Sequence, residues 1–70
     1  MQYRRLEKQR AAERDRVLTE LRDVKSSLDD TYRLFDLTLD PALVEAYIYE
    51  MNALRSRYDH LLRSAKTMFL

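Results

Sequence analysis

The sequence contains no cysteine, no glycine and only one proline. Without cysteine the chain forms neither disulfides nor thiolate metal sites. Its single histidine, His60, supplies too few ligands for an ordinary zinc centre. Glycine supplies the left-handed conformations that many tight turns require, so a small all-β fold is not expected. The chain is instead rich in strong helix formers such as alanine, leucine, arginine and glutamate, which favours an all-α fold.

Long apolar runs are also missing, because no stretch approaches the roughly 18 residues that span a bilayer. The first residues do not resemble a signal peptide. We therefore expect a cytoplasmic protein without a membrane partner. The charges nearly cancel, with 13 basic and 12 acidic residues, so the chain as a whole does not predict a polyanionic partner.

Residues that would support catalysis or bind a cofactor are not recognisable in the sequence. His60 is the only side chain that ordinarily titrates near neutral pH. The residue three positions before it is Arg57, where metal sites of helical bundles have a glutamate. No nucleophile–base pair or phosphate-binding loop is present either. We expect a protein that is not an enzyme, with no catalytic residues, no cofactor and no metal.

Apolar side chains recur every three or four residues in two stretches, which is the helical period. The first stretch contains Val17, Leu21, Val24, Leu28, Thr31 and Phe35. The second contains Val44, Tyr47, Met51, Leu54, Tyr58, Leu61, Ala65 and Met68. These stripes predict one helix over about residues 17–36 and a second helix over about residues 41–68.

The boundary between the two helices has a physical cause in Asp40 and Pro41. Proline disfavours the helical conformation in the residue before it and suits the first helical position, while an aspartate before it can cap the free amides of the new helix. Leu39 and Val44 have the spacing of a hydrophobic staple, in which two apolar side chains pack across the cap. We expect the chain to reverse here.

A link of about five residues makes the helices antiparallel neighbours, so residues 17–70 are predicted to form a helical hairpin. A second apolar row with heptad spacing (Ile48, Leu62, Phe69) exceeds what one partner helix can cover. Because small chains usually need a further support, we expect a homodimer in the form of a four-helix bundle. Its interface, or that with an unidentified protein partner, would consist of Val44, Tyr47, Ile48, Met51, Leu54, Tyr58, Leu62 and Phe69.

Residues 1–16 interrupt the apolar stripe and form a charged N-terminal extension, either helical or frayed. They contain six basic and three acidic residues. The leading interpretation of the whole chain is a protein-interaction or scaffold module, and the alternative is a nucleic-acid-associated accessory protein. Interleaved acids are more typical of a solvent-exposed helix face than of a nucleic-acid site. The possible nucleic-acid contacts are Arg4, Arg5, Lys8, Arg10 and Arg14.

Residues 17–67 resemble the YaaL-like family of small bacterial proteins, a domain of unknown function. The resemblance rests on Asp40-Pro41, Tyr47-Ile48-Tyr49-Glu50, Tyr58, Leu61-Leu62-Arg63-x-Ala65-Lys66 and a preceding helix with Leu34-Phe35. It implies a short helical protein, often encoded near a recombination-mediator gene, and supplies no catalytic residues.

Overall fold

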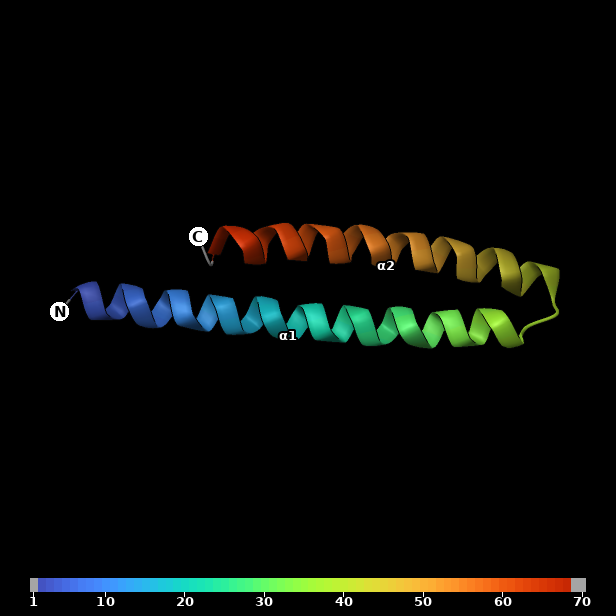
Figure 1. The fold of residues 1–70 in the computed structure, drawn as a ribbon, viewed down its shortest axis with the longest axis horizontal. Coiled ribbons are helices and arrows are strands. Elements are labelled where there is room, and N and C mark those ends of the chain that lie inside the picture. The colour runs from blue at the N-terminus through green and yellow to red at the C-terminus, as the bar shows by residue number, and fades with distance from the viewer. Residues whose placement is uncertain (1, 69–70) are drawn as a thin grey trace.

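Two long helices account for almost all of the chain. The computed structural model describes residues 2–68, in which α1 (Gln2–Leu37) and α2 (Pro41–Met68) lie side by side and run in opposite directions (Figure 1). Residues 38–40 connect them, and residues 2–68 contain no strand. The predicted all-α fold with two packed helices is therefore confirmed. The stretch 2–16 is helical and continuous with the rest of α1.

The seam between the helices is built from the two apolar stripes. Every one of the fourteen stripe residues is buried or half-buried. The most deeply buried apolar side chains are Val17, Val24, Met51, Leu61 and Ala65. Four of these form one cluster, against which further stripe residues from both helices pack. Burial of this seam is what holds α1 against α2.

The core cluster also gives the register of the hairpin. It joins Val17 and Val24 of α1 to Leu61 and Ala65 of α2. The last third of α2 therefore lies alongside the middle of α1, and the first part of α1 extends beyond it, as Figure 1 shows. The hairpin measures 59 × 15 × 14 Å, so it is about four times as long as it is wide.

Thr31 is the one polar residue buried in the seam within the described chain. Its hydroxyl donates a hydrogen bond of 2.8 Å to the carbonyl of Ser27, one turn earlier in α1. This bond satisfies the hydroxyl locally, so the threonine occupies a core position without an unpaired polar atom.

The chain reverses at residues 38–40, and Asp40 caps α2 as predicted. The carboxylate oxygen Oδ1 of Asp40 accepts a hydrogen bond of 2.9 Å from the backbone amide of Ala42. Its carbonyl accepts the first helical bond, also 2.9 Å long, from the amide of Val44. Residues 2–68 contain no positive backbone φ angle. The turn therefore needs no glycine.

The predicted staple between Leu39 and Val44 is wrong. The side chain of Leu39 is 97% exposed, whereas Val44 lies half-buried in the seam. The reason is the short link, because Leu39 is its middle residue and points to solvent while the chain reverses. The cap at Asp40 therefore works without an apolar contact across it.

Asp40→Ala should lower the free energy of unfolding by about 1 kcal/mol, because the amide of Ala42 loses its acceptor. Denaturant unfolding followed by circular dichroism, at one fixed protein concentration, measures the change. Asp40→Asn is the matched control, since asparagine keeps an acceptor oxygen. Equal losses in both variants would contradict the capping role.

Leu39→Ala should change the free energy of unfolding by less than about 0.5 kcal/mol, because the side chain is already in solvent. The same denaturation experiment checks this. A loss as large as that of Asp40→Ala would show that Leu39 makes a stabilising contact after all.

Candidate interaction surface

The hairpin exposes far more surface than a compact protein of its mass. Its accessible area is 6077 Å², against about 4,700 Å² expected from the size scaling of monomeric proteins. Its radius of gyration is 16.7 Å, where a compact chain of this length would have about 11 Å. The excess of about 1,400 Å² arises because each helix has only one neighbour.

Part of this surface is a mixed apolar and aromatic side that both helices share. Arg55 of α2 reaches across to α1, where its guanidinium donates a hydrogen bond to the hydroxyl of Tyr32 and lies 5.8 Å from the centre of that ring. The contact shows that Tyr32 and Arg55 lie on the same side of the hairpin. In the row of Ile48 and Leu62, the position of Arg55 is thus filled by a cation that stacks on an aromatic ring.

Heptad spacing places further residues on the same side. Leu18 precedes Tyr32 by two heptads, and Ile48 and Leu62 flank Arg55 by one heptad each. Ile48 is 42% exposed, and Leu18, Tyr32 and Leu62 are half-buried. We call these four residues, with Arg55, the Tyr32 face. From the sequence Arg55 interrupts the row, and the sequence pattern gave no signal of its contact with Tyr32.

The structure divides the predicted interface residues between the seam and the Tyr32 face. Met51 is buried in the seam, and Leu54 and Tyr58 pack against the core cluster. Val44 and Tyr47 are also half-buried stripe residues. Ile48 and Leu62 belong to the Tyr32 face instead. Phe69 lies outside the described residues.

A second group of exposed apolar side chains gathers at the loop end of the hairpin. Leu34, Leu37, Leu39 and Leu43 are 49%, 81%, 97% and 46% exposed. Leu34 and Leu37 line one shallow depression on α1 together with Asp30 and Arg33, which form an ion pair. Sequence reasoning missed this group as a surface, although the spacing of three residues between Leu34 and Leu37 places them on one side of α1.

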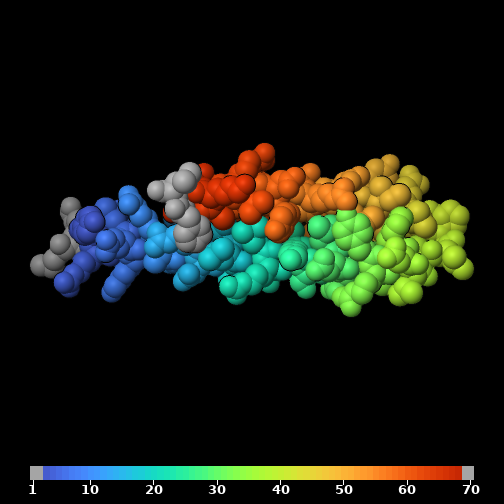
Figure 2. Space-filling model, in the orientation of Figure 1, coloured from blue at the N-terminus to red at the C-terminus, as the bar shows by residue number. Residues whose placement is uncertain are grey.

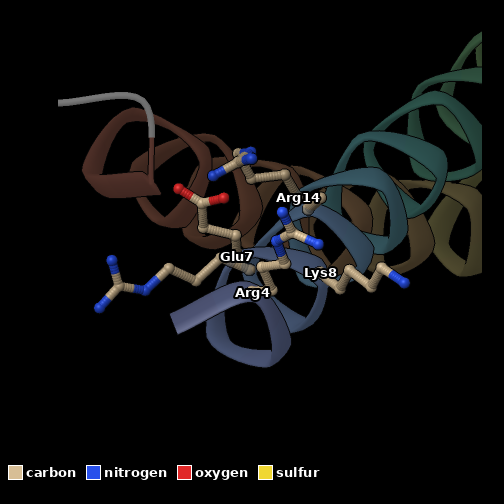
Figure 3. A pocket seen from close by; sticks show the side chains of 6 residues that line it. Arg4, Glu7, Lys8 and Arg14 are labelled. Atoms are coloured by element: carbon tan, nitrogen blue, oxygen red, sulfur yellow. The ribbon is translucent and has the colours of Figure 1, made fainter. Parts of the chain in front are cut away.

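The predicted nucleic-acid residues lie at the opposite end. Four of the five, together with Glu7 and Ala11, line a shallow hollow near the start of α1 (Figure 3). They are Arg4, Lys8, Arg10 and Arg14. Arg5 is exposed beside them, and Arg14 is half-buried where α1 meets Thr67 and Met68 of α2.

Residues 2–16 have little or no cover from α2. All side chains from residue 3 to residue 10 are exposed, including Tyr3 at 73% and Leu6 at 50%. Figure 2 shows this part of α1 projecting past the end of α2. We call residues 2–16 the overhang.

Charge is graded along the long axis. The overhang contains six basic and three acidic residues, a net of +3. The middle, residues 17–28 with residues 57–68 beside them, contains five basic and three acidic residues, a net of +2. The loop end, residues 29–56, contains two basic and six acidic residues, a net of −4. The hairpin is thus basic at one end and acidic at the other.

Other kinds of site find little support in the described chain. His60 is exposed, and residues 2–68 hold no group of three potential metal ligands. Within the same residues no helix combines the length and apolarity needed to cross a membrane.

Comparison with known proteins leads to a family and not to an activity. No curated protein and no solved structure matches the chain significantly. A family model described as a protein of unknown function, DUF2508, matches residues 1–69, so the matched region includes the overhang as well as the hairpin. The chain therefore belongs to this family, which is the YaaL family to which its sequence shows a resemblance.

Proposed function

We propose that the chain is a non-enzymatic protein-interaction or scaffold module that first pairs with a second copy of itself, forming a four-helix bundle. The observation that carries this proposal is the Tyr32 face, to which both helices contribute and which the hairpin covers only in part. A bacterial, cytoplasmic setting is part of the same proposal.

The exposed area is sufficient for such a pairing. A standard stable interface buries about 800 Å² on each partner. The hairpin exposes about 1,400 Å² beyond the expectation for a compact monomer, so one interface of this kind removes most of the excess. Four-helix bundles reach their stability in this way, by packing two helical hairpins around a shared core.

Burial inside the single hairpin is incomplete, which also supports the proposal. Among the described residues no large side chain is buried to more than 98%, and eight of the fourteen stripe residues are only half-buried. Each keeps apolar area that a second hairpin can cover, at about 25 cal/mol for every Å² removed from water. The surface offers contact area rather than a set of reactive groups, and for that reason the proposal is non-enzymatic.

A second candidate, a nucleic-acid accessory role, is favoured by one specific observation. Folding brings Arg57, Arg63 and Lys66 of α2 alongside the middle of α1, directly after the basic overhang. The overhang and the middle together carry a net charge of +5 over more than half of the hairpin's length. Phosphate groups are attracted to such a region without sequence preference.

Ile48→Asp should weaken self-association by at least about tenfold in Kd, because it places a carboxylate in the apolar contact. Sedimentation equilibrium over a range of protein concentrations measures this. Ala53→Asp is the matched control, since it adds the same group at an exposed site on another side of α2. A wild-type chain that remains monomeric, or equal effects of both substitutions, would contradict the proposal.

Arg4→Gln should weaken binding to a fluorescent single-stranded or duplex oligonucleotide and lower the slope of log K against log salt by about 0.7 to 0.9 if Arg4 contacts one phosphate. Fluorescence anisotropy at several salt concentrations measures both quantities. Arg33→Gln is the control, because Arg33 lies at the acidic loop end and pairs with Asp30. Unchanged binding in the Arg4 variant would count against the nucleic-acid role.

A further inference from the structure

Most of the overhang is a helical segment that α2 does not cover, and only its last turns meet Thr67 and Met68 of α2. Residues 3–10 are exposed on every side, and they include the apolar side chains of Tyr3 and Leu6 among basic residues. Isolated helices of this length gain little stability from their own hydrogen bonds, so most helical stability in proteins comes from packing of an apolar side. The overhang is therefore the part of the described chain that most needs a partner surface.

The loop end has the complementary properties. It carries six acidic and two basic residues, and its exposed leucines lie among those acids. Leu34 and Leu37 share a depression with Asp30, and Leu39 and Leu43 flank Asp40. The overhang thus offers apolar groups within positive charge, and the loop end offers apolar groups within negative charge.

We propose that two copies pair antiparallel, with the overhang of each lying against the acidic, leucine-bearing loop end of the other. This inference rests on the self-association proposed above and specifies its geometry. The occupant of each loop end is thus a named segment, residues 2–16 of a second copy.

The lengths of the two segments match this arrangement. The overhang has 15 residues and spans about 22 Å at a rise of 1.5 Å per residue. The loop end reaches from residue 29 to the turn after Leu37, roughly 14 Å of helix plus the link. A two-fold axis perpendicular to the long axis, through the middle of the hairpin, places the overhang of each copy against the loop end of the other. Both overhangs are then covered by one symmetric interface.

Charge decides between the two possible orientations. In a parallel pair the overhangs, each with net charge +3, lie together, and so do the loop ends, each with −4. In the antiparallel pair +3 faces −4 at both ends. Opposite potentials across an interface fix orientation, whereas like charges oppose it. Added salt therefore weakens the antiparallel pair and strengthens a parallel pair.

The test uses the absence of native cysteine, because any introduced cysteine is unique in the full chain. Gln9→Cys marks the overhang, Thr19→Cys marks the middle, and Ala42→Cys marks the loop end, all at exposed positions. Each variant carries one spin label per copy, and pulsed dipolar spectroscopy measures the distance between copies. Helicity and Kd equal to those of the wild type show that a label has not disturbed the protein.

The antiparallel pair places only the labels at position 19 close together, within about 25 Å across the bundle. The labels at positions 9 and 42 then lie at least roughly 30 Å apart along the axis. Sedimentation of the unlabelled protein provides the second measurement. The dimer Kd should rise about tenfold between about 50 mM and about 500 mM NaCl, as several exposed ion pairs are screened.

The outcomes separate the two proposals. Short distances at all three positions, or a Kd that falls with added salt, overturn the antiparallel arrangement and leave self-association standing. A monomer throughout the accessible concentration range gives no dipolar signal between copies and overturns both. A short distance at position 9 alone shows that the overhangs pair with each other, which also overturns the inference.

Discussion

A pair of helices has only one seam, and this geometric constraint governs the rest of the structure. Each helix can hide one side of its surface against the other, so the fourteen stripe residues enter the seam, and every other apolar residue between positions 3 and 68 remains at or near the surface. This constraint is the reason that four apolar side chains outside the seam stay partly exposed: Leu18, Tyr32, Ile48 and Leu62. The elongated shape and the large accessible area follow from the same constraint.

The seam in turn depends on the reversal at residues 38–40. Asp40 binds the amide of Ala42 and accepts the first helical hydrogen bond of α2, and Pro41 supplies a backbone already suited to the first helical turn. The turn is short enough to keep α1 and α2 in contact and uses no left-handed residue in the described chain. A chain without glycine can therefore form a hairpin, provided that a cap and a proline define the start of the second helix.

Periodicity predicted the seam correctly, because a helix buries residues three and four apart whatever its partner. The spacing of Leu39 and Val44 predicted a hydrophobic staple that the structure does not contain. Such a contact depends on the path of the link, which local spacing does not determine. Periodicity also treated Arg55 as an interruption, because a one-dimensional pattern does not show that the guanidinium stacks on Tyr32 across the hairpin. The basic first 16 residues were visible in the sequence, whereas the net charge of the middle of the hairpin appears only when the register places residues 57–68 beside residues 17–28.

The two candidate functions are physically connected through the overhang. In the antiparallel pair its basic residues face the carboxylates of a second copy, and in the nucleic-acid role the same residues face phosphates. Both contacts are electrostatic and occupy the same surface, so they exclude one another at each overhang. Linkage then requires that a polyanion binding only the free overhang shifts the population from dimer to monomer, and that dimerisation weakens polyanion binding to the same extent. An interaction module built on this hairpin would thus respond to the polyanions around it without any change in its fold.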